Sequence, residues 1–150
     1  MSAFQWTLRV TATESETAQV VARRQQFAVG RPLHFDADYR HLTALEYGLG
    51  AIGAEIVNGL RVFARRRRIE IDAIEALVSG ELDNPFTYLE VAGEQGDAGL
   101  SYVKVTVYIA SPEDEQRVRA LWAEVRERLP LVRTFSRATR VTVELRFAAV

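Results

Sequence analysis

The densest group of side chains that could bind a metal or transfer protons lies in "HFDADYRH", residues 34–41. Two imidazoles and two carboxylates within this stretch are plausible zinc ligands: His34, Asp36, Asp38 and His41. Their spacing matches no familiar metal site, and the stretch is typical of a solvated connection. We therefore expect no metal site and no cofactor. His41 could also form an acid–base pair with Glu46, which follows it closely.

A second carboxylate, Glu55, lies within a largely apolar segment. Such a side chain could be partly buried, paired with an arginine, or simply an acid on a helix face. The chain has no cysteine, which excludes thiol peroxidase, disulfide and thiolate–zinc chemistry. Met1 is the only methionine and offers no substitute.

Composition narrows the class of protein further. With 19 Lys+Arg against 20 Asp+Glu, the chain lacks the basic excess of a nucleic-acid-binding protein. No apolar run approaches the ~18 residues of a membrane span, and the first residues do not form a signal peptide. We expect a cytoplasmic protein with neither nucleic-acid nor membrane partners.

Hydrophobic periodicity predicts the elements that hold these side chains. Alternation predicts strands over 4–12, 18–29, 69–82 and 100–110, with a short one over 86–91 and a last one over 138–147. A capping box, "TALE", opens a helix at Thr43 that runs to about Arg67. Ser111 and Pro112 open a second helix, which Pro130 ends. The order predicts one α+β domain over 1–150.

The first helix carries glycines at positions 48, 50, 53 and 59. Each costs roughly 0.5–1 kcal/mol relative to alanine inside a helix, so close packing of another backbone has to offset them. "GLGAIG" has the spacing of a phosphate loop, but it lies inside the helix with no strand before it. We interpret the glycines as close-packing residues of a central helix; a glycine-lined ligand crevice is compatible with this.

The order of elements and three motifs resemble the OsmC/Ohr family (osmotically inducible and organic hydroperoxide resistance proteins). The family's long helix begins with a pattern like "TPxEyLLaALgsC", to which "TALEYGLGAIG" is similar. "RRIEIDAIEALVSGEL" resembles its next strand, and "LPLVRTF" at 129–135 resembles its "CPVsrTL". The resemblance implies two long helices packed against antiparallel sheets in an intertwined homodimer.

The chain also departs from the family pattern at both cysteines and at the loop with the activating arginine. We align the family's peroxidatic cysteine with Ile52 and its second cysteine with Leu129, so both thiols are lost. "TATESETAQ" replaces the loop that carries the family's activating arginine. Glu46 matches the family's acid at the helix start, although its capping role explains it without catalysis.

We therefore expect a redox-inactive OsmC-like homodimer that binds a small apolar ligand at the former active site. The residues expected there, from the resemblance, are Glu46, Ile52, Glu55, Leu129 and Arg133. A structural or regulatory interaction protein, and an enzyme that uses Glu46, Glu55 or the histidines, remain alternatives.

Overall fold

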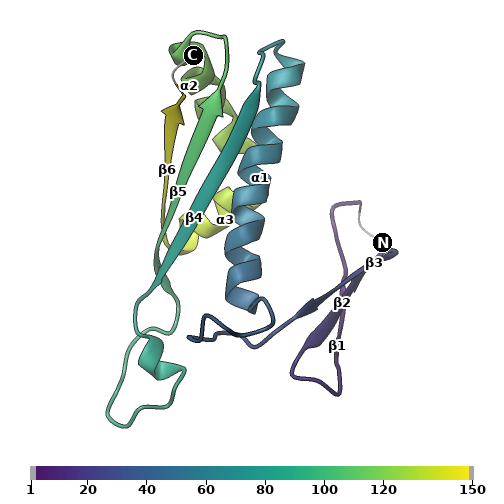
Figure 1. Ribbon diagram of the computed structural model, residues 1–150, viewed down its shortest axis with the longest axis vertical. Helices are drawn as coiled ribbons and strands as arrows, with labels where there is room; N and C mark the ends of the chain where they lie inside the picture. Colours follow the sequence, from purple (N-terminus) through teal and green to yellow (C-terminus); the bar gives the residue numbers. More distant parts are fainter. Residues whose placement is uncertain (1–2, 149–150) are drawn as a thin grey trace. The chain divides into compact units, whose positions relative to one another are not determined.

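A computed structural model describes residues 3–148, which divide after Gly48 into two compact units, 3–48 and 49–148. In the second unit, β4 (Ala73–Leu82) pairs antiparallel with β5 (Leu100–Ala110), and β5 pairs parallel with β6 (Arg140–Phe147). The chain reaches β6 through α2 (Glu115–Val125), a 3₁₀ turn (Arg126–Arg128) and α3 (Pro130–Ala138). Helices α1 (Ala44–Arg66), α2 and α3 all cover one face of this sheet (Figure 1).

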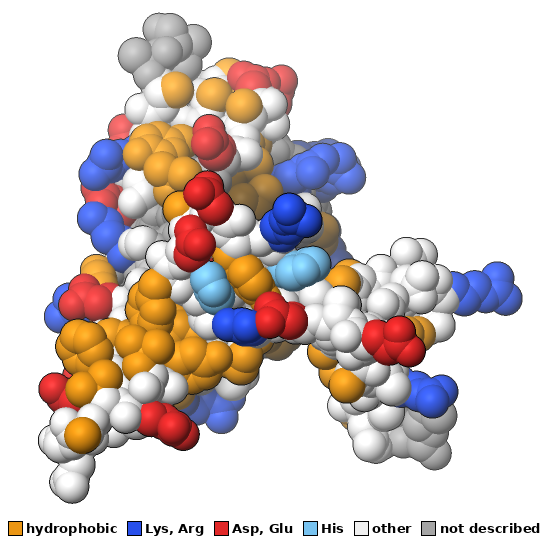
Figure 2. Space-filling model, turned by 60° about the horizontal axis from the view of Figure 1, so that its bottom comes forward, with side chains coloured by type: hydrophobic (Ala, Val, Ile, Leu, Met, Phe, Trp, Pro, Cys, Tyr) orange, Lys and Arg blue, Asp and Glu red, His pale blue; other side chains and the backbone are white. Residues whose placement is uncertain are grey.

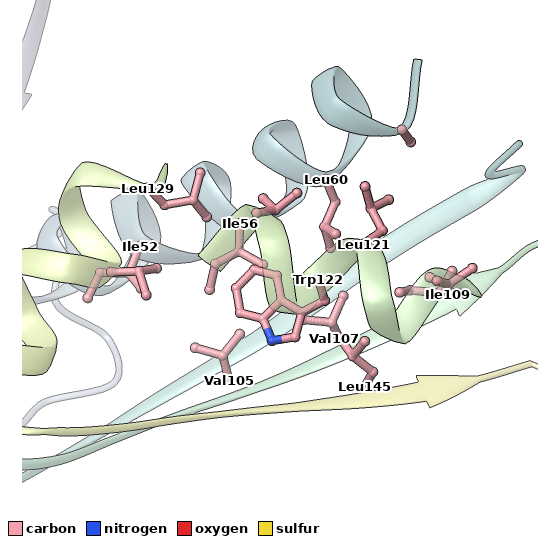
Figure 3. Packing of buried hydrophobic residues seen from close by; sticks show 14 of the residues in the cluster. Ile52, Ile56, Leu60, Val105, Val107, Ile109, Leu121, Trp122, Leu129 and Leu145 are labelled. Carbon is pink, nitrogen blue, oxygen red and sulfur yellow. The ribbon is translucent and has the colours of Figure 1, made fainter. Parts of the chain in front are cut away.

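The core lies between that sheet face and the helices. Inward side chains of β5 alternate along the strand and are fully buried: Val103, Val105, Val107 and Ile109. They meet the buried stripe of α1 and the apolar face of α2, where Trp122 fills the centre (Figure 3). Ile52, Ile56 and Leu60 of α1 have no exposed surface, so this helix is the main apolar support of the second unit.

Two of the four helix glycines allow close packing within the chain. A Cβ on Gly53 would lie 2.6 Å from Val78 Cγ2, and one on Gly59 would lie 2.6 Å from Leu129 Cδ2. Gly48 and Gly50 meet nothing within 4 Å. The interpretation of close packing therefore holds for Gly53 and Gly59.

The first unit contains a three-stranded antiparallel sheet of β1 (Arg9–Ala12), β2 (Ala18–Ala22) and β3 (Gln25–Val29). The single strand predicted over 18–29 was wrong, because Arg23 takes a positive φ of 57° and turns the chain between β2 and β3. The strand predicted from residue 4 begins only at Arg9. Five apolar side chains of this unit remain exposed: Phe4, Trp6, Leu8, Val10 and Phe27.

The α+β class is confirmed, and four further local predictions need correction. The strand expected from residue 69 begins at Ala73, and 86–91 forms no strand but follows a 3₁₀ turn over Pro85–Thr87. Helix α2 begins after Asp114, whose side chain accepts a hydrogen bond from the Gln116 N–H, rather than after Ser111. Pro130 does not end a helix; it occupies the first turn of α3, where its missing N–H costs nothing. Among residues 3–148, no helix is long and apolar enough to cross a membrane.

Candidate functional site

The segment 34–41 is held by its own hydrogen bonds and ring contacts. The Asp36 N–H donates to His34 Nδ1 at 3.1 Å, and the Asp38 N–H donates to Asp36 Oδ1 at 2.9 Å. The Tyr39 ring stacks on His34 at 4.2 Å and meets His41 edge-on at 5.6 Å. The histidines, pale blue in Figure 2, reach the surface. Within the described part of the chain, no group of three or more His, Cys, Asp or Glu side chains could hold a metal ion.

Gly30 makes this arrangement possible. Its N–H donates to the Leu42 carbonyl at 2.7 Å, and a Cβ there would lie 2.7 Å from the Tyr39 hydroxyl oxygen and 2.8 Å from His41 Cβ. The backbone N–H of Arg31 also donates to the Tyr39 hydroxyl, at 3.0 Å. A hollow of about 400 Å³ lies over this segment and reaches Glu46.

Glu46 forms the predicted capping box. Its Oε1 accepts hydrogen bonds from the Thr43 N–H at 3.0 Å and the Thr43 hydroxyl at 2.9 Å, while its own N–H donates to Thr43 Oγ1 at 3.2 Å. These bonds, the backbone one first, hold the pKa of the Glu46 carboxyl below its ordinary value. The carboxylate therefore caps the start of α1, and it accepts hydrogen bonds from Thr43 rather than from His41.

This geometry predicts how acid acts on the helix start. A carboxyl with a lowered folded-state pKa stabilises the fold above its unfolded pKa of about 4.3, and that stabilisation is lost as the pH falls through the folded-state pKa. We expect Glu46→Gln to make stability less dependent on pH in this acid range. Thr43→Val, which keeps the backbone donor, should remove only part of the dependence. Urea unfolding over a pH series measures both, and an unchanged slope in Glu46→Gln would contradict the assignment.

Glu55 connects α1 to α3. Its Oε2 accepts a hydrogen bond from the Leu131 N–H at 2.8 Å, and its Oε1 accepts one from the Val132 N–H at 2.9 Å. These donors belong to the first turn of α3, where backbone N–H groups lack partners within the helix and the helix dipole favours an anion. The N-cap residue Leu129 has no side-chain oxygen to satisfy them. A half-buried carboxylate on another helix thus caps α3.

The other predicted site residues divide between the core and the surface. Ile52 is fully buried in the apolar cluster, and Leu129, 5% exposed, packs against Gly59. Arg133 is exposed and pairs with Glu127 at 3.1 Å. The structure therefore brings Glu55 and Leu129 to the same junction of α1 and α3. Glu46 belongs to the first unit.

Counting residues along the family pattern changes the alignment of the long helix. In "TPxEyLLaALgsC" the cysteine follows the threonine by twelve residues, and Thr43 plus twelve is Glu55. Ile52 and Gly53 fall instead on the "Lg" of the pattern. On this count, the cysteine of the pattern corresponds to Glu55, whose carboxylate binds the start of α3. Sequence reasoning missed the two donors, Leu131 and Val132, although Pro130 is the kind of signal that marks the first turn of a helix.

Comparison with known proteins identifies a family and a fold. Residues 36–144 match the family described as OsmC-like protein. The chain is similar to an OsmC-like protein from Mycoplasma pneumoniae, with 16% identity, 99% of each chain covered and a TM-score of 0.78. It is also similar to an OsmC-like protein of unknown function from Vibrio cholerae, with 11% identity, 97% and 100% coverage and a TM-score of 0.74.

A third solved structure is the organic hydroperoxide resistance protein OhrB of Bacillus subtilis. It shares 20% identity, with 94% of this chain and 98% of that chain covered and a TM-score of 0.60. At these identities the likeness establishes the fold alone. Among curated proteins, none matches the chain.

Proposed function

Because this chain belongs to the OsmC-like family, which it matches over residues 36–144, we propose that it is a redox-inactive member. One observation carries the proposal: the chain has no cysteine. Counting along the family pattern assigns the cysteine position to Glu55, whose two oxygens bind the N–H groups of Leu131 and Val132. A thiolate is the nucleophile that attacks a hydroperoxide and becomes a sulfenic acid. A carboxylate capping a helix does not undergo that oxidation.

The proposal predicts no turnover of organic hydroperoxides. Purified protein, mixed with cumene hydroperoxide and a dithiol reductant, should consume the hydroperoxide no faster than buffer does. The hydroperoxide resistance protein of Bacillus subtilis serves as the positive control under the same conditions. Peroxide remaining is measured over time, and consumption that scales with the concentration of this protein would contradict the proposal.

We also propose that the working form is a homodimer. The first unit supports this, because Trp6, before β1, is 80% exposed and Val10 of β1 is 61% exposed, which leaves apolar side chains in water. On α1, Gly50 and Ala54 are exposed as well, which leaves a small-residue surface that a second helix backbone can approach closely.

The expected result is a particle of twice the 16.9 kDa chain mass in light scattering after size exclusion. Trp6→Glu should shift that mass toward the monomer, since a buried unpaired charge is costly at an interface. Leu77→Glu is the matched control, because Leu77 is 57% exposed on the outer face of β4. A monomeric wild type would overturn the dimer, and equal dissociation by both substitutions would remove its assignment to this surface.

We further propose that a small apolar ligand binds at the former active site. Loss of both thiols leaves the junction of α1 and α3 with Leu129 and the apolar residues around Ile52. Arg133 is the exposed cation of this group on α3. Isothermal titration of the full-length protein with decanol provides the test. Binding that is equal in the wild type and in Arg133→Gln would remove the ligand from this site.

A further inference from the structure

The sheet face opposite the helices carries a tyrosine that has both a cation and a hydroxyl beside it. Side chains alternate along β5, so Tyr102 points away from the buried Val103, on the side of the sheet that the helices leave open (Figure 1). In the parallel register, Tyr102 lies opposite Arg140 of β6, and Lys104 lies opposite Thr142. None of these residues belongs to the surface of the first unit and α1 that we assign to the homodimer.

Two side chains of β6 contact the Tyr102 phenol. The Arg140 guanidinium lies over the ring, 4.3 Å from its centroid. The phenol oxygen lies 2.6 Å from Thr142 Oγ1, a separation typical of a hydroxyl that donates to an anionic oxygen, for which about 2.5–2.7 Å is usual. Either oxygen can donate while the phenol is neutral. Once the phenol is ionised, Thr142 is the donor.

The cations beside the phenol favour its anionic form. Within the described part of the chain, Arg140 forms no ion pair, so no carboxylate neutralises its charge. The hydrogen bond with Thr142 contributes most to lowering the pKa of Tyr102 below its ordinary value. Arg140 and Lys104 lower this pKa further, and desolvation opposes them.

Two acids lie on the same face of the sheet. Glu81 of β4 is opposite Tyr102 in the register, and its charge disfavours a phenolate there. Glu144 of β6 forms its ion pair with Arg146, at 3.1 Å. Neither carboxylate pairs with Arg140, which therefore keeps its charge available to the phenol.

Tyr108 provides an internal comparison on the same strand and face. Like Tyr102, it has an arginine and an acid opposite it in the register, Arg146 and Glu75. Its arginine lies farther away, 6.0 Å from the ring centroid, and is paired with an acid. Two residues beyond that arginine stands Ala148, which has no hydroxyl to donate. Tyr108 is 37% exposed and Tyr102 is half-buried, so exposure alone would make Tyr108 the more reactive phenol.

We propose that Tyr102 is a modification site, at which activated acyl donors acylate the phenol oxygen. A phenolate is a far better nucleophile than a phenol, and the chain offers few competitors, since it has no cysteine and one lysine. The phenolate oxygen attacks the acyl carbon and forms the ester bond. The bond from that carbon to the leaving group breaks, and the leaving group takes its electron pair. The phenol proton goes to solvent, and nothing is oxidised or reduced.

N-acetylimidazole is the probe for this site. The purified full-length protein is treated with it near neutral pH, and acetylated peptides are quantified over time by mass spectrometry. We expect Tyr102 to be acetylated several-fold faster than Tyr108. Because a lowered pKa supplies phenolate at lower pH, the rate at Tyr102 should also level off at a lower pH. Hydroxylamine cleaves aryl acetates but not amides, which separates this product from acetylated Lys104.

Three substitutions test the source of the reactivity. Arg140→Gln and Thr142→Val should each slow acetylation at Tyr102 several-fold and leave Tyr108 unchanged. Arg146→Gln is the matched control, because it removes the arginine over the other ring and should leave Tyr102 unchanged. Circular dichroism establishes that each variant folds, and the ratio of the two tyrosines within one sample cancels differences in reagent concentration.

Two results in the wild type would overturn the proposal without any variant. They are acetylation no faster at Tyr102 than at Tyr108, and acetylation that appears first at another tyrosine. An unchanged rate at Tyr102 in both Arg140→Gln and Thr142→Val would also overturn it. None of these results bears on hydroperoxide turnover, so this proposal and the proposed function fail independently.

Discussion

Glu55→Ala is expected to lower the free energy of unfolding by about 1–3 kcal/mol, the range for leaving buried hydrogen-bonding groups without their charged partner. The substitution removes both acceptors of the first turn of α3 at once. No side chain at the N-cap replaces them, because Leu129 is apolar. Chemical denaturation followed by circular dichroism measures the loss.

Glu127→Ala is the matched control for this prediction. It removes a carboxylate of the same size that pairs with Arg133 at the surface, and such pairs contribute about 0–1 kcal/mol. Glu55→Gln, which keeps one acceptor oxygen, should fall between the two. A loss in Glu55→Ala no greater than that in Glu127→Ala would show that the carboxylate does not hold α3.

Gly53→Ala is expected to destabilise the protein even though alanine favours a helix. The new Cβ would lie 2.6 Å from Val78 Cγ2, and valine has little freedom to rotate away because its χ1 is restricted. Overpacking of this kind costs about 1–3 kcal/mol, which outweighs the ~1 kcal/mol that alanine gains in helix propensity.

Gly48→Ala and a double variant provide the controls. A Cβ on Gly48 meets nothing within 4 Å, so this substitution should stabilise the helix by up to about 1 kcal/mol. Removing the colliding methyl groups in Gly53→Ala/Val78→Ala should cost less than the sum of the two single changes. Strictly additive losses would show that Gly53 and Val78 do not collide.

Local signals made much of the fold predictable. The capping box of Thr43 and Glu46 uses residues three apart, so its pattern is visible in the sequence, and the structure confirms it. The strongly alternating strand over 100–110 was predicted with the bounds that β5 has. Each of these elements is specified by neighbours along the chain.

Other elements were missed where the local signal is ambiguous. Proline can end the helix before it or occupy the first turn of the helix after it. Pro130 occupies the first turn of α3. The turn between β2 and β3 uses Arg23 at a positive φ, where glycine or asparagine would be the usual signal. Sequence reasoning therefore read two strands as one and ended the helical region before α3.

The junction of Glu55 with α3 could not be predicted from spacing alone. Its donors, Leu131 and Val132, lie 76 and 77 residues along the chain, and only the fold brings them together. A residue-by-residue count along the family pattern was the one available signal, since it assigns Glu55 to the cysteine position. Once the start of α3 is known to lie beside Glu55, the role of its carboxylate is clear, because it accepts hydrogen bonds from the first turn of that helix.

The central claim is that a carboxylate on α1 holds the start of α3 at the place where the family pattern has its thiol. The most direct test is the hydrogen exchange of the backbone amides of Leu131 and Val132 in solution. Because both N–H groups donate to Glu55, we predict that Glu55→Ala speeds exchange at these two amides, whereas Glu127→Ala leaves both unchanged. Exchange at Leu131 and Val132 that is the same in Glu55→Ala as in the wild type would contradict the claim.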